Sequence, residues 1–293
     1  MPPILFILKS NIMQLQKAER KQAVIKLTLQ GPSGSGKTYS SLLLAYGLVG
    51  DWNKISIVDT ENNSSHLYSH LGNFNVLSLS EPFSPERYIE AIEVCEKAGM
   101  KAIIIDSISQ EWEGSGGIIE THGNMTGNSF TNWNRVTPRH NAFIQKILQS
   151  SSHIIATVRS KQDYVLTDKN GKMVPEKVGL KGVTRDGTDY EFTVVLDLDI
   201  KHQATASKDR TGLFSNPMPF TITKQTGNRI RVWCQGEDLI KRVESQINDA
   251  KTVQELRNIL IKYPTLRKDI EHLCVNRKAQ IEGVVTDQQV VNP

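Results

Sequence analysis

Apolar and polar residues follow two alternating periods through the first half of the chain. Residues 24–29 alternate as in a strand, and residues 39–46 then place apolar side chains at helical spacing. Residues 54–59 and 101–107 are largely apolar runs, which are typical of central parallel strands buried on both faces. Strands and helices that alternate this regularly predict right-handed crossovers within one parallel sheet, and therefore an α/β fold.

Further segments extend this pattern. We expect a strand at residues 75–79, a helix that begins at the N-cap Ser84, and a strand at residues 153–158. Residues 113–136 are rich in Gly, Asn, Ser and Thr, which predicts an irregular segment, with the next helix beginning at Thr137.

The pattern changes after residue 160. The Asn-Gly pair at 170–171 predicts a β-hairpin, because both residues tolerate the positive φ that tight hairpin turns need. Further strands are expected at residues 192–200, 204–207, 220–223 and 230–233, and helices from residue 238 onward. We therefore divide the chain into an N-terminal extension (1–21), an α/β core with an antiparallel β extension (22–235), a small C-terminal helical region (236–283) and a disordered tail (284–293).

Composition narrows the classes of protein that fit. The chain has 293 residues, a formal net charge of +4 and three widely spaced cysteines, Cys95, Cys234 and Cys274. Three distant cysteines fit neither a disulfide framework nor a zinc site, and no apolar segment reaches the length of a membrane span. We expect a cytoplasmic protein. Met13 is a candidate true start, which would make residues 1–12 an upstream extension.

One motif carries specific chemistry. Residues 31–38 match G-x-x-x-x-G-K-[ST] and lie between a predicted strand and a predicted helix, as a phosphate-binding loop does. Glycines let consecutive backbone N–H groups face the phosphate oxygens, while the helix points its positive amino end at the same anion. Lys37 would reach the β- and γ-phosphates, and Thr38 would hold Mg²⁺. The predicted ATP-binding residues of this segment are Gly31, Pro32, Ser33, Gly34, Ser35, Gly36, Lys37, Thr38 and Tyr39.

Strand ends supply candidate carboxylates. Asp106 closes the apolar run at 101–107 and is the expected second Mg²⁺ partner, with helix capping as its alternative role. Hydrolysis also needs a base that orients and polarises the attacking water. The residues alone leave two candidates for this base, Glu61 and Glu111.

Four segments resemble, in order and spacing, the ATPase core of RecA-family recombinases: the phosphate loop and residues 59–61, 103–107 and 207–210. The resemblance implies a RecA-like P-loop NTPase fold and selects Glu61 as the catalytic base. It gives Tyr68 the place of an aromatic that stacks on adenine, with a core role as the alternative. It also places Lys208 and Arg210 where RecA proteins carry cations that reach the γ-phosphate of the next subunit, which implies a homo-oligomer. A solvated basic turn is the alternative for this pair.

Within that superfamily the chain resembles compact phage ATPases of the Sak type, which act in single-strand annealing or recombination. The resemblance spans residues 22–235 and is carried by residues 59–63, 106–114, 159–161, 187–192 and 207–211. A phage-encoded protein of this type would work in the host cytosol.

The chain departs from RecA in two respects. The N-terminal polymerisation module is missing, so a RecA-type filament is not expected. Thr157-Val158-Arg159 replaces the segment that ends in a polar sensor glutamine, which leaves Arg159 or Lys161 as substitutes.

The loop after the strand at 153–158 contacts single-stranded DNA in RecA proteins. The corresponding residues 161–185 are basic and include an aromatic, which suits sequence-tolerant binding because phosphates supply affinity and stacking accepts any base. Lysines also protect exposed hairpin edges from pairing, which is the alternative explanation. The candidate DNA-binding residues are Lys161, Tyr164, Lys169, Lys172, Lys181 and Arg185.

Together these patterns predict an ATPase that binds ATP and Mg²⁺, forms a homo-oligomer and acts on single-stranded DNA in recombination or annealing. A single-strand DNA-binding protein is a further candidate partner. One rival hypothesis is a motor or loader ATPase that remodels a protein or nucleoprotein complex. The other is a slow nucleotide-dependent switch. Turnover stimulated by DNA distinguishes the first hypothesis from both rivals.

Overall fold

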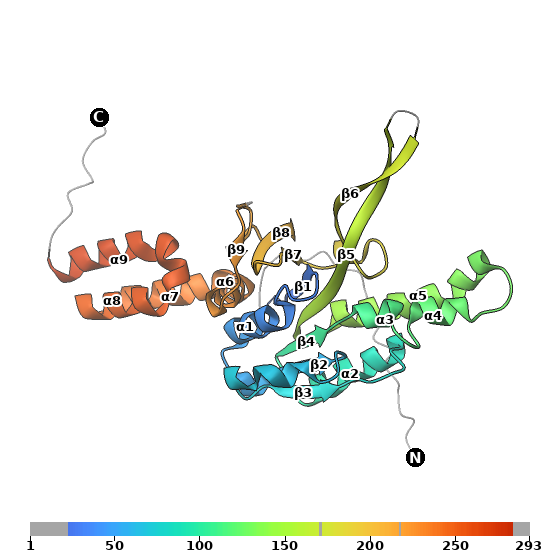
Figure 1. The fold of residues 1–293 in the computed structure, drawn as a ribbon. Helices are drawn as coiled ribbons and strands as arrows, with labels where there is room; N and C mark the ends of the chain where they lie inside the picture. The colour runs from blue at the N-terminus through green and yellow to red at the C-terminus, as the bar shows by residue number, and fades with distance from the viewer. Residues whose placement is uncertain (1–22, 170–171, 217, 284–293) are drawn as a thin grey trace, which may run out of the picture.

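A largely parallel sheet organises the molecule (Figure 1). The computed structural model describes residues 23–169, 172–216 and 218–283. The parallel strands, in spatial order, are β3 (Asn75–Ser78), β2 (Ile55–Asp59), β4 (Ala102–Asp106), β5 (His153–Lys169), β1 (Lys26–Gly31) and β7 (Val194–Leu198). Strands β8 (Gln203–Asp209) and β9 (Phe220–Thr221) extend the sheet in antiparallel fashion. The predicted α/β fold with an antiparallel extension is confirmed.

Helices cover both faces of the sheet. Helices α1 (Lys37–Val49) and α6 (Lys224–Gln235) pack on one face, and α2 (Pro85–Lys97) and α5 (Ser129–Gln149) pack on the other. Each face has its own apolar core, and successive residues of β4 alternate between them: Ile104 joins the core under α1, whereas Ile103 and Ile105 join the other. Because both faces are covered, every residue of β2 and β4 is buried.

The carboxyl edge of the sheet gathers the segments that carry polar side chains. The phosphate loop follows β1, the 3₁₀ helix η2 (Ser64–Leu71) follows β2, and α3 (Ser109–Glu113) follows β4. Open α/β sheets bind ligands at this edge, where the chain turns from strand to helix.

Strand β5 continues beyond the sheet into a long hairpin. Its first part pairs with β1 up to Arg159, and from Ser160 onward it pairs with antiparallel β6 (Lys172–Gly182). The hairpin projects away from the body of the molecule (Figure 1). The predicted hairpin is therefore confirmed, while its Asn170-Gly171 turn lies outside the described residues.

Two local predictions are wrong. The segment predicted as irregular contains α4 (Ile118–Gly123), and α5 begins at Ser129, with Pro138 inside the helix rather than near its start. The strand predicted at 230–233 is part of α6, which packs closely on α1. A Cβ on Gly227 would lie 2.3 Å from the carbonyl oxygen of Leu44, so only glycine permits this approach. Contact with α1 thus outweighs the strand preference of a short β-branched run.

The C-terminal part is a group of helices with a small core of its own. It contains α7 (Glu237–Asp249), α8 (Val253–Lys262) and α9 (Arg267–Ile281), which share a buried apolar cluster. Short 3₁₀ turns lie at Trp52–Lys54 (η1), Thr188–Tyr190 (η3) and Pro264–Leu266 (η4).

Several features of the chain as a whole complete the description. Within the described ranges, no helix combines the length and apolarity that crossing a membrane requires. Cys95, Cys234 and Cys274 are buried, and none of them forms a disulfide bond within the described residues. The predicted N-terminal extension, the candidate start at Met13 and the predicted tail at 284–293 lie outside the described residues.

Candidate functional site

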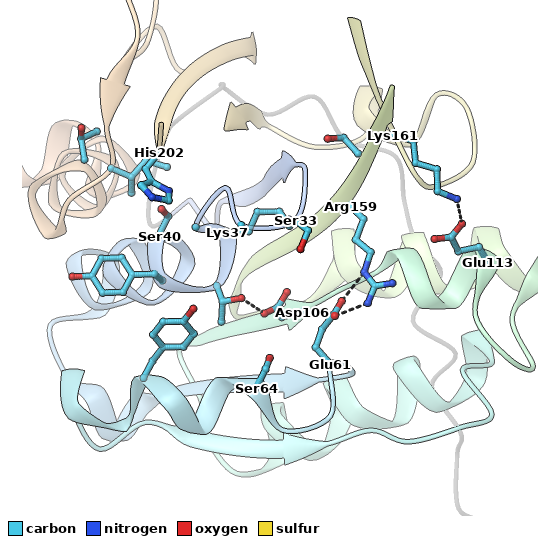
Figure 2. A pocket seen from close by; sticks show the side chains of 18 residues that line it. Ser33, Lys37, Ser40, Glu61, Ser64, Asp106, Glu113, Arg159, Lys161 and His202 are labelled. Carbon is cyan, nitrogen blue, oxygen red and sulfur yellow. Dashed lines mark hydrogen bonds and ion pairs between the residues drawn. The ribbon is translucent and has the colours of Figure 1, made fainter. Parts of the chain in front are cut away.

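A cavity of about 870 Å³ opens at the carboxyl edge, above the phosphate loop. Several separate segments build its wall (Figure 2): the loop and start of α1, the end of β2 with η2, the end of β4, β5, and the turn between β7 and β8. Its polar lining includes Lys37, Thr38, Glu61, Asp106, Glu113, Arg159, Lys161 and His202.

The phosphate loop is shaped by its glycines. Gly34 and Gly36 have φ of 79° and 84°, in the left-handed region that glycine adopts without strain. A Cβ on Gly31 would lie 2.6 Å from the carbonyl oxygen of Leu198, so β1 and β7 can approach only with glycine here.

Lys37 points back over this loop. Its Nζ donates to the carbonyl oxygens of Gly31 and Pro32, each at 2.9 Å. Burial lowers the pKa of Lys37, while the negative charges of Asp106 and Glu61 oppose that shift. An anion above the loop would raise the pKa of Lys37 again, because a nearby negative charge favours the charged ammonium.

Asp106 is the most enclosed carboxylate of the cavity. The Thr38 hydroxyl donates to its Oδ2 at 2.6 Å, and the Thr157 hydroxyl donates to its Oδ1. Burial raises the pKa of Asp106, and these two hydrogen bonds pull it back down. A hydroxyl and a carboxylate in contact beside a phosphate loop are the hard oxygen donors that Mg²⁺ prefers, so the residues fit this ion.

Glu61 lies across the cavity from Lys37 and is held from two sides. The Arg159 guanidinium donates through Nε to Glu61 Oε1 at 2.9 Å and through a second nitrogen to Oε2 (Figure 2). From the other side, Ser107 Oγ donates to Glu61 Oε1 at 3.1 Å. The loop that carries Glu61 is fixed by Asp59, whose carboxylate accepts from the backbone N–H groups of Glu61 and Ser65. The carboxylate therefore faces the cavity in a defined position.

Glu111, the other candidate base, lies elsewhere. It is fully buried, and its carboxylate contacts His140 Nδ1 at 3.0 Å. Burial raises the pKa of Glu111, and the hydrogen bond from His140 opposes this. Among the described residues that line the cavity, Glu111 is absent, so the structure separates the two candidates.

Two tyrosines form one end of the cavity. The rings of Tyr39, on α1, and Tyr68, on η2, lie 6.0 Å apart between centroids and are tilted by 56°. Tyr68 also packs against the core under α1, so it combines the cavity position with the core role that the sequence left as an alternative.

Lys208 and Arg210 lie away from this cavity. Strand β8 runs antiparallel to β7, which places Lys208 opposite Val195 and Arg210 beside Thr193, toward the amino ends of the strands. Both cations donate to the carbonyl oxygen of Tyr190. The phosphate loop of the same chain lies at the opposite edge of the sheet, so the fold does not bring these residues to their own site.

The candidate DNA-binding residues cluster at the base of the hairpin where their side chains are described. Lys161 Nζ contacts Glu113 at 2.6 Å, Lys181 contacts Asp186 at 2.8 Å, and Arg185 donates to Asn141 at 3.4 Å. The side chains of Tyr164, Lys169 and Lys172 lie outside the described part of the hairpin.

His202 is a cavity residue that sequence reasoning missed. It occupies the turn between β7 and β8 with a φ of 62°, and its Nδ1 lies 3.0 Å from the position that a Cβ on Gly36 would take. The imidazole therefore stands beside the amino end of α1 (Figure 2). A lone histidine after a predicted strand carries no motif, so nothing in the sequence marks it.

A comparison with known protein families identifies the family of this chain. A family model described as an AAA domain matches residues 23–230, which cover the sheet, the cavity and most of α6. The chain belongs to the AAA domain family. This AAA domain is a P-loop ATPase, which agrees with the phosphate loop and with the carboxylates of Asp106 and Glu61 in the cavity. A search of curated proteins finds no match to the chain.

Proposed function

We propose that this AAA domain is a RecA-like ATPase of the Sak type, which hydrolyses ATP while acting on single-stranded DNA in recombination or strand annealing. One observation carries the proposal: β5 runs without interruption from the wall of the nucleotide cavity into the projecting hairpin. A single strand thus links the place where ATP binds to the element proposed to bind DNA.

ATP would bind with its triphosphate on the phosphate loop and its base toward the tyrosines. Lys37 would exchange its two backbone carbonyl partners for phosphate oxygens, which offer a full negative charge. The adenine would lie against Tyr68, with Tyr39 beside it.

Thr38 and Asp106 would hold Mg²⁺, as their donor chemistry allows. The ion supplies positive charge that neutralises the phosphates. Thr157 would orient the Asp106 carboxylate through the hydrogen bond that it already donates.

Glu61 would act as the base that orients and polarises the attacking water. It lines the cavity and is half-buried, whereas Glu111 is fully buried and paired with His140. Arg159 would hold the Glu61 carboxylate in place and would present its own charge to the γ-phosphate, in the place left by the missing sensor glutamine.

Lys208 and Arg210 would complete the site of a neighbouring subunit. Their position at the far edge of the sheet rules out a direct role in their own cavity in this conformation, and Arg210 is exposed while Lys208 is partly exposed. In a homo-oligomer they would stabilise charge on the transferring phosphoryl group in trans.

The two proposed activities share an ion pair. Lys161 and Glu113 contact each other at 2.6 Å, and both line the nucleotide cavity as well as a second cavity at the foot of the hairpin. Because exposed ion pairs are weak, a DNA phosphate that draws Lys161 away would change the charge around bound ATP. This supports turnover that depends on DNA.

Steady-state ATPase activity with and without single-stranded DNA tests the proposal, with duplex DNA as the control and salt varied. We expect single strands to stimulate turnover, and stimulation to fade as salt rises. Turnover that is indifferent to DNA but responds to a protein would favour a motor or loader. Tight nucleotide binding without appreciable turnover would favour a switch.

A further inference from the structure

A second cavity, of about 670 Å³, lies at the foot of the hairpin. One side is formed by α3, α4 and α5, and the other by the start of the hairpin and residues 181–186. Its lining combines aromatic and apolar side chains with cations: Trp112, Ile119, Trp133, Lys161, Lys181 and Arg185.

The aromatic wall is a continuous stack. The rings of Trp112 and Trp133 lie 6.0 Å apart at an interplanar angle of 24°, and His122 stacks on Trp133 at 4.1 Å and 21°. The edge of the buried His140 meets Trp112 at 5.5 Å, and Glu111 fixes His140 in turn. The buried Glu111–His140 pair therefore has a structural role, which is to support one end of this stack.

Apolar surface around the stack is exposed to solvent. Ile119 lines the cavity and is 46% exposed, and Phe130 is 84% exposed one turn before Trp133 on α5. Trp112 and Trp133 both line the cavity and are partly exposed, and because their ring centroids lie 6.0 Å apart the rings overlap only in part, which leaves part of a flat aromatic face for a planar ligand.

Cations surround the aromatic surface. Lys161 and Lys181 are paired with Glu113 and Asp186, but the side chains of both lysines are more than half exposed, so these pairs are screened by solvent. Within the part of the chain that the structure describes, Arg185 donates a long hydrogen bond to Asn141, at 3.4 Å. Phosphates can therefore compete for all three side chains.

We propose that this cavity binds a nucleobase of single-stranded DNA, which stacks on the Trp112–Trp133 pair while the flanking phosphates contact Lys161, Lys181 and Arg185. This inference rests on the proposed function and deepens it, because it gives the strand a defined binding surface beside the hairpin. Aromatic stacking combined with phosphate contacts is the chemistry of sequence-tolerant single-strand binding. The arrangement suits this ligand better than a peptide, because flat aromatic faces and clustered cations match a base and its phosphates.

Fluorescence anisotropy with labelled oligonucleotides tests the proposal. The probes are oligodeoxythymidine and an abasic strand of equal length, which keeps the phosphates but removes the bases. Wild-type protein should bind the thymidine strand about 5- to 100-fold more tightly than the abasic strand. Trp133→Leu should lose this preference while keeping its affinity for the abasic strand, and Trp133→Phe should retain most of it.

Two controls separate folding from recognition. Trp52→Phe alters an indole of a different stacked pair, with Tyr46 at 4.6 Å, and should behave as wild type. Binding of a fluorescent ATP analogue should be the same in every variant, because neither Trp52 nor Trp133 is among the described residues lining the nucleotide cavity.

The possible failures are distinguishable. Wild-type protein that binds neither strand would contradict the proposed action on DNA. Two other results would overturn the stacking site alone: equal binding of both strands by the wild-type protein, or a preference for bases that persists in Trp133→Leu. In either case DNA binding would be assigned to the hairpin.

Discussion

Arg159 and Glu61 form a two-pronged ion pair across the nucleotide cavity, although 98 residues separate them in the chain. Glu61 follows β2 and Arg159 lies on β5, and β4 stands between these strands in the sheet. The hydrogen bonds that Arg159 donates to Glu61 raise the pKa of Arg159, so the guanidinium stays charged at any working pH. The proposed base and the proposed γ-phosphate sensor are thus held as one unit.

Removing Arg159 should impair hydrolysis more than binding. Arg159→Ala frees the Glu61 carboxylate to rotate, so we expect kcat to fall by about 10- to 100-fold while the affinity for ATP changes less. Arg159→Lys should recover little of the lost kcat, because a lysine ammonium cannot bond both oxygens of Glu61 as the guanidinium does. Lys161→Ala, two residues along β5, is the matched variant and should reduce DNA stimulation rather than basal kcat. Steady-state kinetics of the three variants measure this, and an unchanged kcat in Arg159→Ala would contradict the assignment.

The cations of β8 should act on a neighbouring subunit. The Lys208→Ala, Arg210→Ala double variant should lose about 100-fold or more in turnover, since cations supplied in trans carry large effects in phosphoryl transfer. Mixing it with Glu61→Gln should restore part of the activity, because each partner supplies what the other lacks.

The control for this experiment is a Lys97→Ala, Lys101→Ala double variant, which removes two exposed lysines elsewhere and should keep full activity. Mixed oligomers, verified by co-purification, that show no recovery would refute the trans arrangement.

Tyr68 should contribute to recognition of the base and not of the phosphates. Tyr68→Ala should weaken ATP binding about 10-fold, whereas Tyr68→Phe keeps the ring and should stay near wild type. Competition against a fluorescent ATP analogue measures both. Tripolyphosphate, which has no base, should bind Tyr68→Ala as well as wild type. An equal loss for both ligands would show that Tyr68 acts only through the core.

His153 should make the fold sensitive to mild acid. Burial, with the nearby Lys26 charge, lowers the pKa of His153 from 6.5 to about 4, and its Nδ1 accepts from the backbone N–H of Ile25 at 3.1 Å. In the unfolded chain His153 therefore binds a proton below pH 6.5, whereas in the folded protein it does so only below about pH 4. The free energy of unfolding should fall by about 1 to 2 kcal/mol between pH 7 and pH 5 because of this residue.

Urea denaturation at a series of pH values measures that loss. His153→Asn offers an acceptor oxygen but does not titrate, so its stability should decline less over the same range. If the free energy of unfolding falls equally with pH in the variant and the wild type, His153 is not the cause of the loss.

The sequence predicts correctly those elements whose pattern of apolar and polar residues matches the way they pack in the folded chain. Residues 101–107 are predicted as a buried parallel strand, and residues 102–106 form β4, because their apolar side chains pack into a core on each face of the sheet. The strand predicted at 230–233 is helical instead, because α6 packs on α1 through Gly227. The local sequence pattern does not indicate that contact. Pro138 misleads in a similar way, because a proline that usually starts a helix lies within α5.

The same distinction applies to the candidate site, where residues within a contiguous motif are predictable and residues brought together by folding are not. The phosphate loop and Asp106 are recognisable because each sits on a contiguous motif. The choice between Glu61 and Glu111 depends on which way each strand end faces, and residue types alone leave it open. His202 and the Trp112–Trp133 stack come from turns and helices that meet only in the folded chain, so neither has a signal in the sequence.

Single-turnover hydrolysis of ATP by Glu61→Gln and Glu111→Gln tests the account most directly. Glu61→Gln should bind ATP with an affinity near that of wild type and hydrolyse it at least about 100-fold more slowly, because the base is lost while the phosphate loop is intact. Glu111→Gln should hydrolyse ATP at close to the wild-type rate if it folds, since its side chain supports His140 and not the cavity. A Glu61→Gln protein with wild-type turnover would contradict the central claim that this cavity hydrolyses ATP with Glu61 as its base.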